Sequence, residues 1–392
     1  MPWSDITPMS QRQEFIELYH ERRHTVAELC CVFHVSEKTA YKWLARFRAD
    51  GVAGLADRSH TPKCAPHQPS PDVIGKILAF RAKHPTWGAR KLRNRLATRD
   101  PVTHWPAPST IGTLLNRHGL IRKRRHSNNR RGPRLDQPLT TAHGPNDVWT
   151  GDFKGQFMLQ GGAECYPLTV ADLHSRFLLG CTALGGPRAQ LTQLVFRRLF
   201  QSYGLPRVIR TDNGVPFASA HSLGGLSALS LWWIHLGIRP ERIEPGQPQQ
   251  NGQHERMHRT LKADAIRPAA SRTLVEQQRR FDRFRREFNT ERPHEALGQH
   301  TPASHYSSSP REYPSKLPEF EYPEHFAVRL VSSIGSIKWF DRPLFLSKVV
   351  AGERVGLEET EPDRWNIALG PLVLGVFDPT CHQFHPAPYW RE

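Results

Sequence analysis

Four patterns of apolar and polar residues follow one another along the chain. From about residue 11 to 60, and again from 71 to 119, apolar residues recur every three or four positions, which predicts short amphipathic helices. Between residues 148 and 289, runs of strand length come first and helices then alternate with short strands. Beyond residue 320, five short β-like runs fit a small antiparallel barrel. The pattern predicts a multidomain protein with α-helical modules, an α/β core and a C-terminal small β-barrel.

Residues 1–60 have the layout of a helix-turn-helix DNA-binding domain. Thr25, with Glu28 three residues later, predicts a capping box, and Ser36 is the predicted N-cap of a second helix. An ordinary pair of packed helices would give the same pattern, but the second helix carries residues suited to contacting DNA. These candidate DNA-binding residues are Lys38, Thr39, Tyr41, Lys42 and Arg46.

A second helical unit, predicted over residues 70–121, follows a proline-rich linker. Its last helix, from Ser109 to Gly119, has the position of another recognition helix, although simple helix packing also explains it. Residues 122–145 form a basic linker, in which seven of the thirteen residues from Arg122 to Arg134 are Lys or Arg and none is acidic. An arm lying along DNA phosphates is favoured over a solvated charge run. Its candidate contacts are Arg122, Lys123, Arg124, Arg125, Arg130 and Arg131.

The charge balance also favours a nucleic-acid partner. The formal net charge is +17 and the sequence pI is near 10.0, a surplus expected of a protein that binds polyanions. General solubility would explain a smaller surplus. The chain has no apolar run long enough for a membrane span and no secretory signal pattern, so we expect no membrane partner and a cytoplasmic location.

The cysteines give little evidence for a metal site. None of the six forms a Cys-x-x-Cys pair, and the adjacent Cys30 and Cys31 cannot easily ligate one zinc ion together with His20 and His24. Buried free thiols in a reducing compartment are the favoured interpretation.

Three acidic residues stand in distinctive settings. Asp152 lies in an apparent strand, predicted to project from the same face as Trp149, and Asp212 ends another strand before an Asn-Gly turn. Glu255 lies in the first turn of a helix, with Arg259 and Lys262 on the same face. Any three of the 37 acids would mean little by spacing alone. Carboxylates gathered from separate elements are, however, what hard divalent cations require.

The settings of these acids resemble the three core motifs of the retroviral-integrase superfamily. Its DDE-type insertion-sequence transposases are the most similar members. The matching segments are Trp149-x-x-Asp152, Thr211-Asp212-Asn213-Gly214, Asn251-Gly252-x-x-Glu255 with Leu261-Lys262, and Asn289-x-x-Arg292-Pro293-His294. The resemblance is strong over residues 146–304 and looser over the N-terminal modules and over the C-terminal domain, residues 310–392.

This resemblance implies an RNase H-like catalytic core in which Asp152, Asp212 and Glu255 bind two Mg²⁺ or Mn²⁺ ions. It implies a DNA transposase that binds terminal inverted repeats and catalyses DNA cleavage and strand transfer. Partners would be double-stranded DNA, both transposon ends and target, and further copies of the chain in a dimer or tetramer on DNA. Asn213 and Asn251 would shape the turns, Arg259 and Lys262 would contact DNA, and Asp172 would support the site.

Two departures from the family and two rival functions stand beside this prediction. The gap between Asp212 and Glu255 is 42 residues rather than the usual thirty-five or so, and the zinc-binding HHCC module of retroviral integrases is missing. One rival is a non-catalytic DNA-binding regulator derived from a transposase. The other is an RNase H-like nuclease acting on RNA or junctions, which the paired helix-turn-helix units disfavour.

Overall fold

The computed structural model describes residues 7–58, 69–121, 139–219, 222–244, 247–267, 269–339, 342–361 and 364–387. Contacts between residues divide the chain into two compact units, Met1–Pro69 and Ser70–Glu392, each described by itself. In the described parts, no helix combines the length and apolar character needed to span a bilayer. The basic-linker residues Arg122 to Arg131 lie outside the described residues.

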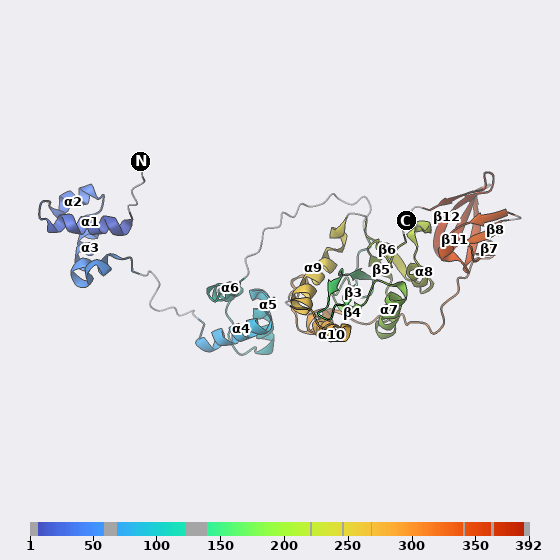
Figure 1. The fold of residues 1–392 in the computed structure, drawn as a ribbon, viewed down its shortest axis with the longest axis horizontal. Coiled ribbons are helices and arrows are strands. Elements are labelled where there is room, and N and C mark those ends of the chain that lie inside the picture. The colour runs from blue at the N-terminus through green and yellow to red at the C-terminus, as the bar shows by residue number, and fades with distance from the viewer. Residues whose placement is uncertain are drawn as a thin grey trace. The chain divides into compact units, whose positions relative to one another are not determined.

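The first unit is a three-helix cluster (Figure 1). Its core joins Phe15, Leu29 and Trp43, each less than a tenth exposed. The capping box predicted at Thr25 is present, because Glu28 N–H donates to the Thr25 hydroxyl and Thr25 N–H donates to the Glu28 carboxylate. The helices are α1 (Pro8–His20), α2 (Val26–Val32) and α3 (Glu37–Asp50), followed by a 3₁₀ turn, Gly51–Leu55.

The second unit begins with three more helices, α4 (Pro71–Lys83), α5 (Ala89–Arg99) and α6 (Pro108–Arg117), packed around Trp87 and Ile111. Several of their polar residues are paired with acids at the end of a later helix, α10 (Leu274–Thr290), or just beyond it. The pairs are His84–Glu287, Arg90–Glu295 and Arg99–Glu291, each with a nitrogen–oxygen distance of 2.8 Å. Part of the basic charge of α5 is therefore paired with acids of the protein itself, at the surface.

A mixed sheet forms the middle of the second unit. Strand β1 pairs antiparallel with β3, which pairs antiparallel with β4, whereas β5 and β6 continue parallel on the other side of β1. This is the RNase H-like arrangement expected for the core. The strands are β1 (Val148–Phe153), β2 (Phe157–Met158), β3 (Glu164–Asp172), β4 (Leu178–Leu184), β5 (Val208–Thr211) and β6 (Arg239–Arg242).

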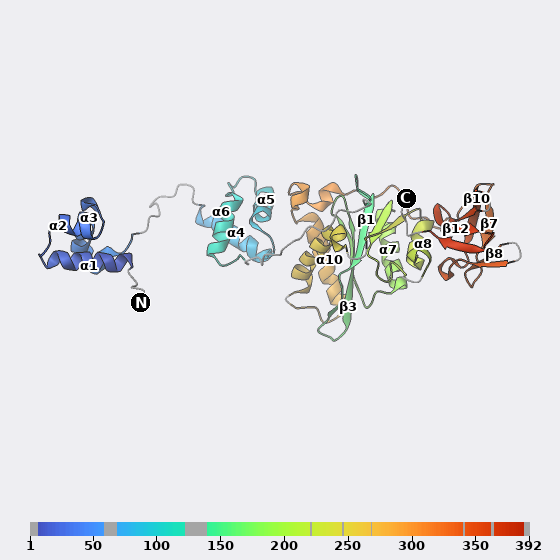
Figure 2. The same ribbon diagram turned by 90° about the horizontal axis from the view of Figure 1, so that it is seen from above.

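Helices cover both faces of this sheet (Figures 1 and 2). On one face, α7 (Ala189–Tyr203) and α8 (Ala228–His235) pack on the sheet through a core that includes Trp149 of β1 and Phe196 of α7. On the other, α9 (Gly252–Leu261) and α10 pack through Leu261 and Phe281. Trp149 therefore lies on the α7 face of the sheet, whereas Asp152, three residues further along β1, lies on the α9 face. Successive residues of a strand face opposite ways, so the prediction that these two share a face is wrong.

The segment from Leu223 to Leu236 is not one continuous helix. A 3₁₀ turn, Leu223–Gly225, comes first, and Gly224 and Gly225 have φ of 53° and 66°. Positive φ at two successive residues cannot continue a right-handed helix. Ser227 then caps α8 through a capping box with Ser230, so the helix starts again.

The C-terminal region is an antiparallel β domain with a core that includes Ile337, Val355 and Phe377. Its main sheet has the order β13-β12-β11-β10-β7, and β8 and β9 form a separate hairpin. Two strands beyond the five predicted are present, and the described strands do not close into a barrel. The strands are β7 (Ala327–Leu330), β8 (Ser336–Trp339), β9 (Arg342–Phe345), β10 (Arg354–Glu361), β11 (Arg364–Leu369), β12 (Leu372–Asp378) and β13 (Gln383–Pro386).

The cysteines only partly follow the prediction of buried thiols. Cys30, Cys165 and Cys181 are buried and free, but Cys31 and Cys381 are exposed.

Replacing Leu261 by Ala should destabilise the core, because Leu261 is fully buried where α9 meets the sheet and α10. The expected loss in the free energy of unfolding is about 3–5 kcal/mol. The matched control is Leu194→Ala on α7, where the side chain is 46% exposed and the loss should stay below about 1 kcal/mol. Urea unfolding followed by tryptophan fluorescence measures both, and equal losses would contradict the packing assigned to α9.

Candidate active site

Two of the three predicted acids come from neighbouring parallel strands. Strand β1 pairs with β5 in a register that sets Thr150 opposite Arg210. Continued by two residues, the same register brings Asp152, on β1, beside Asp212, the residue directly after β5. Neighbouring strands lie about 4.8 Å apart, so the two carboxylates occupy one edge of the sheet.

The turn after β5 fixes the position of Asp212. Gly214 N–H donates to the Asp212 carboxylate over 3.1 Å, and the Asn213 side-chain amide donates to the Ile243 carbonyl just beyond β6 over 2.7 Å. A Cβ at Gly214 would lie 3.1 Å from an Asp212 carboxylate oxygen, closer than ordinary van der Waals contact. Glycine thus permits the tight turn, and the Asn213 hydrogen bond ties this turn to the end of β6.

Glu255 approaches the site from α9. Asn251, 6% exposed, is the N-cap residue of this helix, and Glu255 lies in its first turn. The Glu255 side chain is exposed, whereas its neighbours His254 and His258 are buried against the sheet. Its negative charge contributes to raising the pKa of Asp152, so the third acid lies within electrostatic reach of the first.

Asp152 is the most perturbed of the three acids. Burial raises its pKa to about 7, and the charges of Asp212 and Glu255 raise it as well. The Phe153 backbone N–H and the charge of Lys154 oppose this rise without cancelling it. In the part of the chain that the structure describes, this mostly buried carboxylate has no direct cationic partner to neutralise it, a setting that fits a divalent cation with oxygen ligands.

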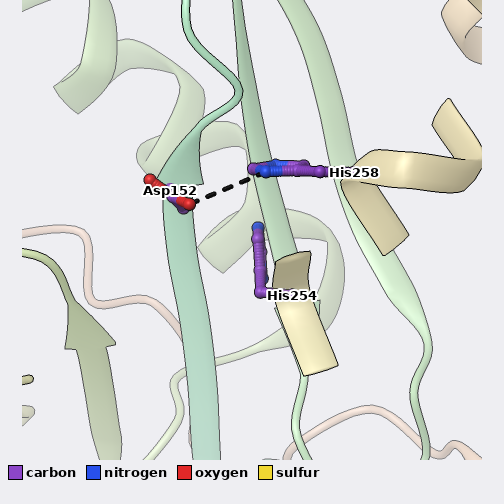
Figure 3. Close-up of side chains that lie close together, drawn as sticks. All are labelled: Asp152, His254 and His258. Carbon is purple, nitrogen blue, oxygen red and sulfur yellow. Dashed lines mark ion pairs between the residues drawn. The ribbon is translucent and has the colours of Figure 1, made fainter. Parts of the chain in front are cut away.

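Behind Asp152 lies a buried polar network that the sequence analysis missed (Figure 3). The His254 ring contacts the Thr150 hydroxyl through Nδ1 at 2.8 Å and the Thr169 hydroxyl through Nε2 at 2.6 Å. The His258 Nε2 contacts the same Thr169 hydroxyl at 2.7 Å, and its Nδ1 lies 3.7 Å from Asp152 Oδ2. The spacing of the two histidines by one helical turn is the signal that could have revealed the network.

Burial keeps both imidazole rings neutral. It lowers the pKa of His254 to about 3 and that of His258 to about 2, and the neighbouring ring and Lys154 add to the lowering at His258. Ligand atoms of Asp152, His254 and His258 all lie within 4.8 Å of one another, the one such potential metal-binding group found among the described residues.

The other predicted site residues are placed as follows. Asp172 is 1% exposed, and its carboxylate accepts hydrogen bonds from the Asn146 N–H and from the N–H and hydroxyl of Ser175. These hydrogen bonds fasten two turns and reach none of the three acids. Arg259 and Lys262 are exposed at the end of α9.

In the first unit, Lys38, Tyr41 and Lys42 are exposed on α3. Thr39 is half-buried, and its hydroxyl lies 3.0 Å from that of Ser36 at the N-cap. Arg46 is also half-buried, with its guanidinium over the Trp43 ring.

Known families match most of this architecture. Models described as integrase core domain match residues 142–248 and 236–302. A helix-turn-helix domain model matches residues 11–63, and a homeodomain-like domain model matches residues 39–115. These matches assign DNA-binding modules to the N-terminal part of the chain.

Two insertion-element proteins are similar over much of their length. An uncharacterized 39.2 kDa protein of insertion element IS476 from Xanthomonas euvesicatoria is 27% identical over 262 residues, which are 66% of this chain and 72% of that protein. An uncharacterized 31.7 kDa protein of IS407 from Burkholderia multivorans is 26% identical over 59% of this chain and 82% of that protein. The chain belongs to the insertion-sequence transposases of the retroviral-integrase superfamily.

Solved integrase structures also match this transposase. The catalytic core domain of HTLV-2 integrase, determined in complex with magnesium, aligns with a TM-score of 0.33 and 16% identity. The alignment covers 42% of this chain and 99% of that domain.

Asp152→Asn should stabilise the metal-free protein at neutral and higher pH. Because the pKa of Asp152 is raised in the folded state, wild-type stability should fall as pH rises from about 4 to about 7, whereas the Asn variant lacks this loss. At pH 8 the variant should be more stable by roughly 2–4 kcal/mol, and near pH 4 the two should be equal. Urea unfolding in EDTA at both pH values measures this, and a pH-independent difference would contradict it.

Proposed function

We propose that this transposase binds the terminal inverted repeats of its element and catalyses metal-dependent cleavage and strand transfer at their ends. The observation that carries the proposal is the convergence on Asp152 of the charges of Asp212 and Glu255. Burial already disfavours the ionised form of Asp152 on β1, and acids from the end of β5 and from α9 add their repulsion to it. A site that only stabilised the fold would gain nothing from this repulsion.

Asp152, Asp212 and Glu255 would hold the two Mg²⁺ or Mn²⁺ ions expected of this superfamily. Such ions would activate the attacking water or 3′-hydroxyl and stabilise the leaving oxygen. The turn at Gly214 keeps one carboxylate aimed at the sheet edge, and α9 brings in another from a separate element. Arg259 and Lys262, exposed on the same helix, would hold DNA phosphates near the acids.

The N-terminal modules would supply the recognition of the DNA ends. Residues 1–60 and 70–121 would form two binding domains joined to a catalytic core over residues 146–304 by the basic linker, with residues 310–392 as a further domain. The two transposon ends must be held together in one assembly, so a dimer or tetramer on DNA is part of the proposal. The alternative, a regulator that binds DNA without cutting it, is not favoured by the gathering of the acids.

Cleavage tests the catalytic assignment directly. Asp152→Asn should abolish Mg²⁺-dependent cutting of a duplex that carries the element's end sequence, by at least about a thousandfold, because one ligand of the reacting centre is lost. DNA binding, measured by gel shift, should be unchanged. The matched control is Glu324→Gln, an exposed acid in the C-terminal region, which should cut normally. Wild-type protein that binds the ends but never cuts them would favour the regulator.

The recognition helix is tested by salt dependence. Removing the exposed cations Lys38 and Lys42 by alanine substitution should weaken binding to the end sequence. If each contacts one phosphate, each loss should reduce the slope of log affinity against log salt by about one. Lys316→Ala, at another exposed position, is the control. An unchanged slope in both variants would place DNA on another face of the module.

A further inference from the structure

Asp152 and His258 face each other without a hydrogen bond. The carboxylate oxygen Oδ2 and the ring nitrogen Nδ1 lie 3.7 Å apart, and the side chains are 19% and 7% exposed. This separation is too long for a hydrogen bond. Both atoms are common metal ligands, and both point into the same space beside the strand end (Figure 3).

The proton on His258 can be located by counting the contacts of the Thr169 hydroxyl. That hydroxyl donates to the Asp152 backbone carbonyl over 3.0 Å and contacts Nε2 of both His254 and His258. A hydroxyl has one hydrogen to donate and two lone pairs, and a carbonyl only accepts. Whether the hydroxyl hydrogen goes to the Asp152 carbonyl or to Nε2 of His254, the contact with His258 is satisfied only if Nε2 of His258 carries hydrogen. Neutral His258 then has a bare lone pair at Nδ1, directed at Asp152.

His254 differs from His258 in this respect. Its Nε2 contacts the Thr169 hydroxyl over 2.6 Å, and its Nδ1 contacts the Thr150 hydroxyl over 2.8 Å. Both nitrogens are therefore occupied, and His254 has no lone pair left for an ion. Its position within 4.8 Å of the other two ligands reflects its role in holding Thr169 and the neighbouring ring.

An unprotonated nitrogen and a carboxylate oxygen that face each other across this distance form an arrangement that a cation between them would stabilise. Two adjacent ligands about 2.1 Å from one octahedral ion lie about 3.0 Å apart, so the 3.7 Å pair needs to close by about 0.7 Å. The hydrogen bond from Nε2 to Thr169 fixes the ring orientation, as the second nitrogen of a metal-binding histidine commonly does.

We propose that Nδ1 of His258 and the carboxylate of Asp152 are ligands of the same divalent cation. The proposal rests on the metal site of the proposed function and adds a nitrogen ligand to its carboxylates. A nitrogen ligand favours Mn²⁺, Co²⁺ and Zn²⁺ over Mg²⁺, which prefers oxygen. The site would thus bind Mn²⁺ more tightly than a site built from acids alone.

The test uses the full-length protein with Mn²⁺ alone, in a nitrogen-free buffer. Electron spin echo envelope modulation should show coupling of bound Mn²⁺ to a ¹⁴N nucleus, and the coupling should change when the wild-type protein is labelled with [¹⁵N]histidine. His258→Asn should abolish the imidazole coupling and weaken Mn²⁺ binding in calorimetry by at least about tenfold, with a smaller effect on Mg²⁺. His254→Asn, the same substitution at the neighbouring ring, should keep the coupling.

The results distinguish the His258 ligand from the carboxylate metal site on which it depends. Mn²⁺ bound in an Asp152-dependent manner without nitrogen coupling would overturn the His258 ligand and leave the carboxylate site standing. Coupling lost in His254→Asn but retained in His258→Asn would also overturn it. Mn²⁺ binding that is absent, or unchanged in Asp152→Asn, would overturn the metal site of the proposed function itself. The labelled wild-type measurement needs no substitution, so a variant that misfolds cannot decide the question.

Discussion

The arrangement of the integrase core depends on holding Asp152, which is largely removed from water, within electrostatic reach of Asp212 and Glu255. Asp152 feels both the loss of hydration and the charges of Asp212 and Glu255, and its pKa rises to about 7 as a result. The rest of the core must supply the free energy that this repulsion removes. It does so through the pairing of β1 with β5, which fixes two acids by backbone geometry, and through the packing of α9 on the sheet, which fixes the third.

Helix α9 meets this constraint by separating its two faces. Its buried side places Met257 and Leu261 in the core and the two histidine rings against the threonine hydroxyls of β1 and β3. Its exposed side presents Glu255 and Arg259, followed by Lys262 at the start of a π-helical turn, Lys262–Ile266. Because residues three and four apart share a helix face, one short segment can anchor itself and present both a metal ligand and cations for DNA.

The motifs predicted the positions of the acids better than their surroundings. A strand that ends in Asp-Asn-Gly leaves few positions for Asp212, and the pattern of β1 fixed Asp152 within a strand. The contact of Thr169 with His258 depends on the antiparallel register of β1 and β3, which sets Asp152 opposite Thr169, and no local pattern reveals that register. Strand β12 was not predicted because Leu-Val-Leu-Gly-Val-Phe lacks the alternation expected of a half-exposed strand. The break at Gly224 was not predicted because it results from positive backbone φ angles, which the apolar pattern does not reveal.

Net charge overstates the positive surface that this protein offers to DNA. Arg210 is 5% exposed, and its guanidinium is held by Glu241 at 2.6 Å and by the Thr140 carbonyl. Arg292 is similarly buried and paired with Asp264, and cations of α5 are paired with acids beyond α10. Such arginines contribute to the formal charge of +17 but cannot exchange counterions with a phosphate backbone without first losing an internal partner. The salt dependence of DNA binding should therefore reflect the exposed cations, such as those of α3 and of the end of α9, rather than the total charge.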